Sequence, residues 1–181
     1  RSEIYGPGLR FVVWVQGCTL ACEGCWNKQF WSPRGGDSTT VESLMERIEA
    51  TEGIEGITLL GGEPLQQAEA VLELIMACKE KELTVFLYTG YEPEEFDQTM
   101  QACFDSSDIA VTGRYEQTMR NTSLQWRGSE NQKVHFIGDR YSRVLIDEGN
   151  YIEIHIDGSG TLDAFGYCEK PFIDGLSDMV G

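Results

Sequence analysis

Three cysteines form the densest group of reactive side chains in this chain of 181 residues. They follow the spacing C-x3-C-x2-C, at Cys18, Cys22 and Cys25, directly after an apolar run. Thiolates are ligands that suit zinc or an iron–sulfur cluster. No fourth cysteine lies nearby, and the two histidines, His135 and His155, lie far along the chain. We therefore favour a cubane cluster held by three thiolates, with one iron free to bind another group, over a structural zinc site.

A second candidate group follows the next predicted strand. The short apolar run at residues 56–60 ends at Gly61-Gly62-Glu63-Pro64. The carboxyl ends of parallel strands meet at one edge of a sheet, and ligand sites gather there. By itself this segment indicates an ordinary turn from strand to helix. Because the preceding strand carries the cysteine loop, we interpret it as part of the same site.

The elements that must position these groups alternate along the chain. Continuous apolar runs of β-formers predict buried strands, and apolar residues at i, i+3, i+4 and i+7 predict helices. The predicted strands are 11–15, 56–60, 84–88 and 108–111, and the predicted helices span 39 or 40 to 50, 67 to 82 and 93 to 104. This alternation predicts right-handed βαβ units and an α/β fold with a parallel sheet.

The pattern changes after the fourth predicted strand. Residues 115–132 are polar and irregular, and residues 133–137 have the composition of one more strand. Apolar residues then alternate at period two over 151–156 and 161–165, on either side of an Asp-Gly-Ser-Gly turn. This alternation predicts a C-terminal β-hairpin with one buried face.

Composition limits the classes of function. The chain is 41% hydrophobic and 24% charged, as in a globular protein with one domain over residues 1–181. Its net charge of −16 argues against a nucleic-acid partner, which needs a cationic surface. No apolar run approaches the roughly 18 residues that span a membrane, and the N-terminus has no secretory signal pattern. We expect neither a nucleic acid nor a membrane as partner.

The charge is unevenly distributed. Residues 10–36 carry Arg10, Lys28 and Arg34 against Glu23, a local charge of +2, so the rest of the chain sums to −18. If this neighbourhood stays electropositive in the fold, an acidic electron donor such as flavodoxin or ferredoxin could dock there. The alternative is a set of solvated basic side chains.

The other three cysteines indicate the compartment. Cys78 and Cys103 lie in helical patterns, and Cys168 lies near the C-terminus. We interpret them as buried, reduced thiols rather than as a disulfide framework, which predicts a reducing, cytoplasmic environment.

The cysteine loop and the Gly-Gly-Glu segment, in this order, resemble the signature of the radical S-adenosylmethionine superfamily. Further segments look most like the glycyl-radical-enzyme activases, and among them the activases of anaerobic ribonucleotide reductases. These segments are Gly6-Pro7-Gly8-Leu9-Arg10, Gly24-Cys25-Trp26-Asn27, Thr89-Gly90-Tyr91 and residues 126–132. The superfamily often has an aromatic residue before the third cysteine; here Gly24 stands there and Trp26 follows, as in the reductase activases.

The resemblance implies a partial (β/α) barrel with a core over about 5–137 and a C-terminal extension over about 138–181. It implies a [4Fe-4S] cluster on Cys18, Cys22 and Cys25, whose free iron binds the amino and carboxylate groups of S-adenosylmethionine. Reductive cleavage would yield methionine and a 5′-deoxyadenosyl radical. That radical would take a hydrogen atom from a glycine Cα of a partner, leaving a glycyl radical.

Binding of S-adenosylmethionine assigns candidate roles to further residues. Gly61, Gly62 and Glu63, followed by Pro64, would receive its amino group, because glycines let backbone carbonyls approach closely. Three more residues have two interpretations each. Trp26 is either loop packing or a wall beside the cluster and the adenine, and Thr89 and Tyr91 are either turn residues or cofactor contacts.

Two regions leave the substrate open. Residues 126–132 are either a partner-facing surface or a structural cap, and the hairpin either covers an open barrel edge or adapts the enzyme to another partner. The favoured function is activation of an anaerobic ribonucleotide reductase. The alternatives are activation of another glycyl radical enzyme such as pyruvate formate-lyase, modification of a peptide or small molecule, or a non-enzymatic electron carrier or sensor.

Overall fold

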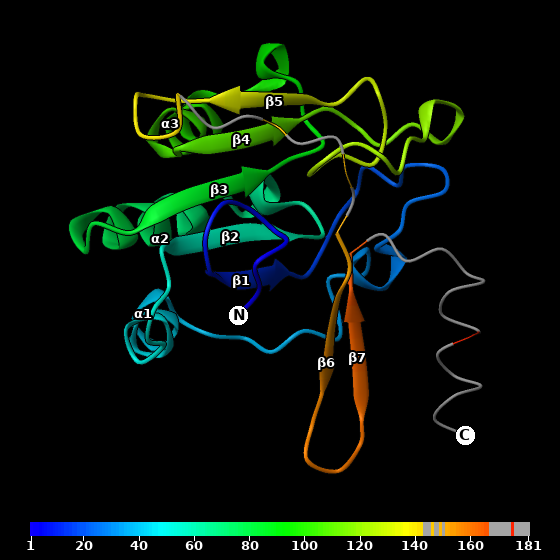
Figure 1. The fold of residues 1–181 in the computed structure, drawn as a ribbon. Coiled ribbons are helices and arrows are strands. Elements are labelled where there is room, and N and C mark those ends of the chain that lie inside the picture. The colour runs from blue at the N-terminus through cyan, green and yellow to red at the C-terminus, as the bar shows by residue number, and fades with distance from the viewer. Residues whose placement is uncertain (143–145, 147–148, 150, 167–174, 176–181) are drawn as a thin grey trace.

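The computed structural model describes residues 1–142, 146, 149, 151–166 and 175. Its centre is a five-stranded sheet with the order β1-β2-β3-β4-β5 (Figure 1). The strands are β1 (Arg10–Val15), β2 (Gly56–Gly61), β3 (Thr84–Tyr88), β4 (Ile109–Thr112) and β5 (Lys133–Phe136). The first four are parallel, as predicted, and β5 runs antiparallel to β4. The α/β class with a parallel sheet is confirmed, and the partial barrel stays a prediction.

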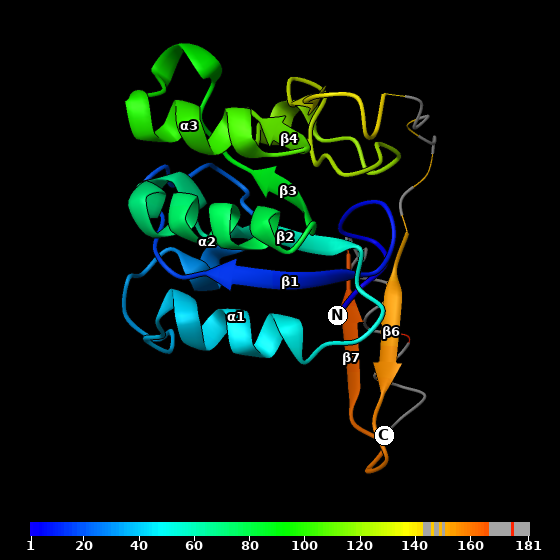
Figure 2. The ribbon, with the colours of Figure 1, turned by 90° about the vertical axis from the view of Figure 1, so that its left-hand side faces the viewer.

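Three helices lie side by side on one face of the sheet (Figure 2). They are α1 (Val41–Glu49), α2 (Ala68–Glu80) and α3 (Gln98–Ser106). Their buried residues pack with those of the central strands into one core, which includes Ile48, Ile75, Ile57 and Leu87. No helix in the described part of the chain is long and apolar enough to cross a bilayer.

Two helix boundaries differ from the sequence prediction. The predicted helix over 93–104 is a short 3-10 turn, η3 (Pro93–Glu95), followed by α3. The side chain of Asp97 accepts hydrogen bonds from the backbone of Thr99 and Met100, so the helix begins anew after Asp97. Similarly, the 3-10 turn η2 (Pro64–Gln67) precedes α2.

Burial along the strands depends on their place in the sheet. Nearly every residue of β2, β3 and β4 is buried, as their continuous apolar runs predict. Residues 11–15 of β1 are only half-buried, which corrects the prediction that this strand is buried on both faces. The reason is that β1 is the edge strand of the sheet.

Arg10 is a buried arginine at the start of β1. Its guanidinium donates to the hydroxyl of Thr84 at 2.5 Å, to the hydroxyl of Thr58 at 3.2 Å and to the carbonyl of Ile57. The Thr58 hydroxyl in turn donates to the carbonyl of Tyr5 at 2.7 Å. These hydrogen bonds hold the N-terminal segment, at Tyr5, against β2.

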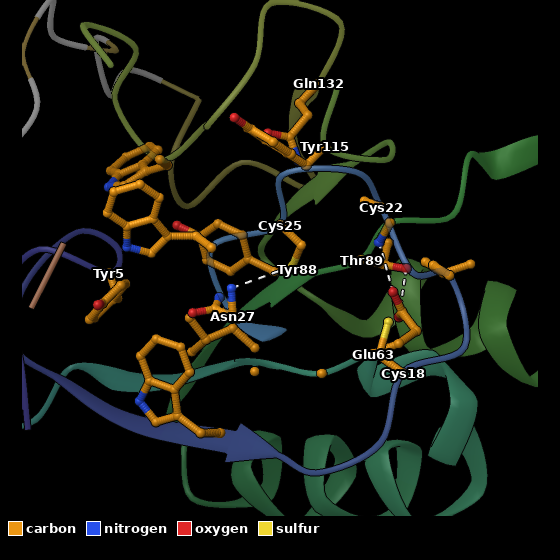
Figure 3. A pocket seen from close by; sticks show the side chains of 18 of the residues that line it. Tyr5, Cys18, Cys22, Cys25, Asn27, Glu63, Tyr88, Thr89, Tyr115 and Gln132 are labelled. Carbon is orange, nitrogen blue, oxygen red and sulfur yellow. Dashed lines mark hydrogen bonds between the residues drawn. The ribbon is translucent and has the colours of Figure 1, made fainter. Parts of the chain in front are cut away.

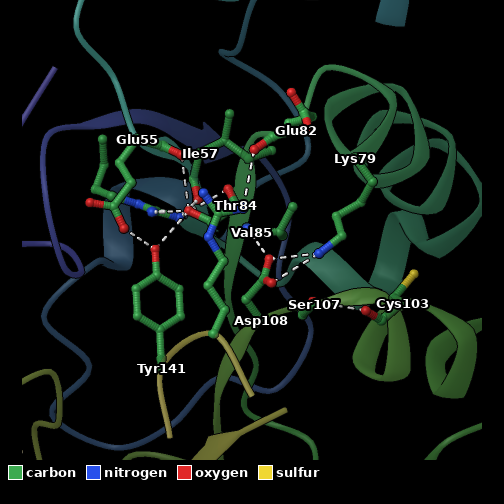
Figure 4. Close-up of polar contacts among 12 residues, drawn as sticks. Glu55, Ile57, Lys79, Glu82, Thr84, Val85, Cys103, Ser107, Asp108 and Tyr141 are labelled. Carbon is green, nitrogen blue, oxygen red and sulfur yellow. Dashed lines mark hydrogen bonds and ion pairs between the residues drawn. The ribbon is translucent and has the colours of Figure 1, made fainter. Parts of the chain in front are cut away.

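A second group of polar side chains supports this end of the sheet (Figure 4). The Tyr141 hydroxyl contacts Glu55 and lies 3.0 Å from the hydroxyl of Thr84. On the helix side, Lys79 pairs with Asp108 at 2.9 Å. All these partners come from segments far apart in the sequence.

The C-terminal hairpin consists of β6 (Glu153–Ile156) and β7 (Leu162–Phe165), and it stands apart from the main sheet (Figure 1). The hairpin is confirmed, but its predicted buried face is not found: Ile154 and Ile156 are 39% and 70% exposed. The hairpin contacts the N-terminal segment: the backbone of Gly166 donates to the Tyr5 hydroxyl at 3.1 Å, and the Ser2 hydroxyl donates to Glu153.

Candidate functional site

A cavity of about 180 Å³ lies at the carboxyl ends of β1, β2 and β3 and beside the loop that follows β4 (Figure 3). It brings together most of the predicted site residues. Those that line it are Cys18, Cys22, Cys25, Trp26, Gly61, Gly62, Glu63 and Thr89. Residues separated by about seventy positions in sequence therefore share one cavity, because parallel strands end at the same edge.

The cysteine loop is held at its first cysteine by backbone hydrogen bonds. The amides of Gly17 and Cys18 donate to the carbonyls of Phe30 and Trp31 at 2.8 and 3.0 Å. The amide of Glu63 donates to the carbonyl of Gly17 at 2.9 Å. The cysteine loop follows β1, and the hydrogen bond between Glu63 and Gly17 joins it to the end of β2.

Gly24 explains the departure from the aromatic residue common in the superfamily. Its φ of +72° lies in the left-handed region, which glycine adopts without strain. A Cβ at this position would come within 2.4 Å of the side chain of Gln117. The backbone conformation therefore favours glycine before Cys25, and a larger residue would also require the Gln117 side chain to move.

The three thiols influence one another. Burial raises the pKa of Cys18 and of Cys22, and the charge of the neighbouring Cys25 raises both further. A backbone amide opposes this at Cys22, because a hydrogen bond from Tyr115 lowers the pKa of that thiol. The amide of Asn27 donates to Cys25 Sγ at 3.4 Å. Amide donors to sulfur are typical of iron–sulfur sites.

This donor chemistry fits an iron–sulfur cluster. Three closely spaced thiolates repel one another, so a cationic cluster would be needed to keep them deprotonated. Among the described residues, no three Cys, His, Asp or Glu side chains already lie together as a metal-binding group. In a cubane cluster each cysteine binds a different iron, so the three thiols of this cavity need not meet at one metal ion.

Glu63 is a fully buried carboxylate that joins the ends of β2 and β3. It accepts hydrogen bonds from the Thr89 hydroxyl and the Gly90 amide, both at 2.8 Å, and from the Leu65 amide at 2.9 Å. Burial raises its pKa to about 7, although these three donors favour the charged form. A carboxylate offers about four acceptor positions, so one remains for a further donor in the cavity.

Gly61 and Gly62 have a packing reason to be glycines. A Cβ on Gly61 would lie 2.6 Å from the backbone of Val15, and one on Gly62 would lie 2.3 Å from the carbonyl of Gly17. The two glycines therefore let the β2 end approach the cysteine loop. We had predicted that they admit a cofactor; whether they also do so stays a prediction.

Two predicted site residues do not line the cavity. Pro64 is buried at the first position of η2. Tyr91 points to a neighbouring network: its hydroxyl accepts from Gln66 at 3.0 Å, and the guanidinium of Arg114 lies 5.7 Å from its ring centre. Trp26 does line the cavity and remains 43% exposed, with Arg120 5.8 Å from its ring centre.

The sequence did not reveal several aromatic and polar residues of the cavity. They include Tyr5, Trp14, Asn27, Tyr88, Tyr115 and Tyr151. Two of them could have been predicted from their positions in the sequence, because Tyr88 ends a predicted strand and Asn27 closely follows the cysteines. Tyr5 and Tyr151 come from the N-terminal segment and the hairpin base, and no local pattern marks them.

Residues 126–132 form a hydrogen-bonded segment beside the cavity, and whether they cap the fold or face a partner stays open. The Gln132 side chain accepts from the amides of Gly128 and Ser129 and donates to the carbonyl of Gly113 at 3.0 Å. Trp126 has a φ of 62° and packs its ring edge-on against Phe86. Trp126 and Gln132 also line the cavity, so this segment closes one side of the site.

The remaining cysteines agree with the prediction where they are described. Cys78 and Cys103 are buried and free, and burial raises their pKa to about 12 and about 11. Cys168 lies outside the described residues.

The fold and site define a class of protein. A family described as a 4Fe-4S single cluster domain matches residues 4–135, which include the cysteine loop and the Gly-Gly-Glu segment. The chain therefore belongs to this class of iron–sulfur domains. The hairpin lies beyond the matched region.

Similar proteins narrow the class further. The chain is 34% identical over 140 residues to the anaerobic ribonucleoside-triphosphate reductase-activating protein of Vibrio cholerae, covering 73% of this chain and 90% of the relative. Proteins of the same name from Enterobacteria phage T4 and Escherichia coli K12 are 35% and 32% identical, over 72% and 74% of this chain and 86% and 92% of the relatives. The chain belongs to the family of anaerobic ribonucleoside-triphosphate reductase-activating proteins, which confirms the resemblance.

Proposed function

We propose that this protein is a radical S-adenosylmethionine enzyme that installs a glycyl radical in an anaerobic ribonucleoside-triphosphate reductase. The observation that carries the proposal is one cavity lined by three cysteines and by Gly61, Gly62 and Glu63. Its support from relatives is that proteins at 32–35% identity over most of their length are named as activators of that reductase.

The chain's own residues divide the work at the site. Cys18, Cys22 and Cys25 would hold a [4Fe-4S] cluster, and amides such as that of Asn27 would stabilise the thiolates. A cluster held there would supply one electron, received from a reductant, for the cleavage of S-adenosylmethionine to methionine and a 5′-deoxyadenosyl radical. That radical would take a hydrogen atom from a glycine Cα of the partner. The residues of the cavity would exclude water from that radical.

Other residues would position S-adenosylmethionine. Gly61, Gly62 and the remaining acceptor position of Glu63 would accept hydrogen bonds from the N–H groups of its amino group. Trp26 would form a wall beside the adenine. Thr89, which donates to Glu63, would act by holding that carboxylate in place, and Pro64 and Tyr91 would act through the neighbouring backbone and side chains.

The proposed architecture is a single domain over residues 1–181. We propose that the sheet is a partial (β/α) barrel whose core spans about 5–137, with an extension over about 138–181. An incompletely closed barrel would leave a side through which a segment of a protein substrate could enter.

The reductant is proposed from the charge near the cysteine loop. Lys28, Arg34 and Arg120 are exposed, and Arg120 lies beside Trp26. An acidic electron donor such as flavodoxin or ferredoxin would dock there by charge complementarity. Arg10, which we had counted in this basic region, is buried in the core and does not contribute.

One experiment tests the function directly. The cluster is reconstituted without oxygen, reduced and mixed with S-adenosylmethionine, with and without the reductase from the same source. Deoxyadenosine together with a glycyl radical signal on the reductase is the expected result.

The other outcomes point to the alternatives. Deoxyadenosine without a radical on the reductase would contradict this partner and favour another glycyl radical enzyme, such as pyruvate formate-lyase, or a peptide or small-molecule substrate. Failure of the reconstituted cluster to bind S-adenosylmethionine would refute both enzymatic hypotheses and favour an electron carrier or sensor.

A further inference from the structure

Gln66 contacts the cysteine loop through both atoms of its side-chain amide. It lies in η2, three residues after Glu63. Its Oε1 accepts from the backbone amide of Thr19 at 3.0 Å, and its Nε2 donates to the Thr19 hydroxyl at 2.7 Å. Thr19 directly follows Cys18, so this paired contact fixes the backbone next to the first proposed ligand.

Gln67, the next residue, contacts the cysteine loop on the N-terminal side of Cys18. Gln67 Nε2 donates to the carbonyl of Gln16 at 2.8 Å. Two adjacent glutamines of η2 thus hold the chain before and after Cys18. Because η2 follows the Gly-Gly-Glu segment directly, the same turn that ends β2 also orients the first cysteine.

The contact extends to the end of β3 through Tyr91. Gln66 Nε2 also donates to the Tyr91 hydroxyl at 3.0 Å. The Tyr91 amide donates to the Thr89 hydroxyl at 3.1 Å, which itself donates to Glu63. The ends of β1, β2 and β3 are therefore linked by one side-chain network around the cavity.

We propose that Gln66 is a positioning residue for the cluster site: it clamps Thr19 and thereby holds Cys18 toward the cavity before a cluster binds. This inference rests on the proposed role of Cys18 as a ligand. A loop that is already fixed next to one ligand loses less conformational freedom when the cluster binds. Tyr91 supports the clamp from β3, which gives this residue a role outside the cavity.

The first test needs no cluster. In the apo protein, the alkylation rate of Cys18 is measured by peptide mass spectrometry for the wild type and for Gln66→Leu. The change removes the two hydrogen bonds to Thr19 and the one to Tyr91, so the loop should open more often and the alkylation rate of Cys18 should rise roughly tenfold. Gln101→Leu is the matched control, because Gln101 donates to Asp105 on α3, away from the site, and it should leave the rate unchanged.

Conservative variants separate positioning from general damage. A glutamate at position 66 can accept from the amide and hydroxyl of Thr19 and from Tyr91, so Gln66→Glu should restore most of the protection of Cys18. Thr19→Val keeps only the backbone contact and should give an intermediate rate. The alkylation rates are compared at a temperature where both variants are folded, so that a lower melting temperature of Gln66→Leu does not affect the comparison.

The second test uses the reconstituted protein. Gln66→Leu should bind less iron and give a broadened electron paramagnetic resonance signal for the reduced cluster, and Gln66→Glu should restore a narrow signal. Unchanged alkylation of Cys18 in Gln66→Leu, or an unchanged cluster signal despite faster alkylation, would overturn the proposal. If the wild type forms no glycyl radical on the reductase, the proposed function fails but the alkylation result still decides the role of Gln66.

Discussion

At the scale of single residues, the site combines groups whose charged forms are disfavoured by burial. The thiols of Cys18 and Cys22 have raised pKa values, and so has the carboxyl of Glu63. A cluster and a cationic cofactor would each reverse this, because positive charge stabilises thiolates and carboxylates. Binding of positive charge at the site would therefore stabilise the charged forms of these groups.

Replacement of Cys22 by alanine should remove the cluster. Two thiolates leave a cubane cluster without its third protein ligand, so bound iron and sulfide should fall to background and deoxyadenosine should not form. Both are measured after anaerobic reconstitution. Cys103→Ala is the control: Cys103 is buried in α3, so this variant should retain its full iron content. Cleavage that persists in Cys22→Ala would refute the ligand role.

Glu63 should make stability depend on pH. Its pKa in the folded protein is about 7 against an ordinary value of 4.5, so its contribution to stability is fully present below about pH 4.5 and is lost as the pH rises through 7. The pKa difference corresponds to about 3 kcal/mol as an order of magnitude.

The test is urea unfolding of the apo protein at pH 5 and pH 8, for the wild type and Glu63→Gln. The free energy of unfolding of the wild type minus that of the variant should be larger at pH 5 than at pH 8, because glutamine does not titrate. An equal difference at both pH values would show that Glu63 has an ordinary pKa in the folded chain.

At the scale of elements, the site depends on how the N-terminal segment is fastened. Tyr5 lines the cavity and packs edge-on against Trp14, with ring centres 5.4 Å apart. Its carbonyl is held by Thr58, and Thr58 accepts from Arg10. Arg10, at the start of β1, therefore holds Tyr5 in place through Thr58, and Tyr5 forms part of the cavity wall.

Replacement of Arg10 by methionine should destabilise this arrangement. The change leaves several buried oxygens without donors, including the carbonyl of Ile57, and should lower the free energy of unfolding by about 2–4 kcal/mol. Chemical denaturation measures the loss. Arg140→Met should change it by less than about 0.5 kcal/mol, because Arg140 is exposed. Equal effects of the two substitutions would contradict the role given to Arg10.

At the scale of the whole molecule, charge and shape act together. The chain carries a net charge of −16, yet Lys28, Arg34 and Arg120 are exposed near the cysteine loop. An acidic reductant would be repelled by most of the surface and attracted near the cluster. The hairpin, with its exposed Ile156, projects away from the five-stranded sheet.

Cluster reduction by an acidic flavodoxin should therefore depend on these cations. Lys28→Glu should slow reduction, and salt should slow the wild type, because exposed charges are screened over about 8–10 Å at physiological ionic strength. Stopped-flow absorption measures the rate. Lys81→Glu is the control of equal charge, because Lys81 is exposed at the C-terminal end of α2, away from the cysteine loop. A rate that rises with salt would show that net repulsion dominates and that no docking site lies beside the loop.

The sequence by itself determined the chemistry of this protein and the order of its elements. The cysteine spacing, the Gly-Gly-Glu segment and the apolar periods are local patterns, and a strand followed by a loop places its motif at a known edge of the sheet. These patterns predicted four parallel strands, the hairpin and eight of the residues that line the cavity.

Only the tertiary structure decided which side chains meet. Arg10 is buried and Ile156 exposed, against expectation, because burial depends on what packs over a strand and not on its own period. Tyr91 turns to Gln66 instead of the cavity, and Tyr5 and Tyr151 reach the cavity from the two ends of the described chain. Such contacts join distant segments, so no local pattern can contain them.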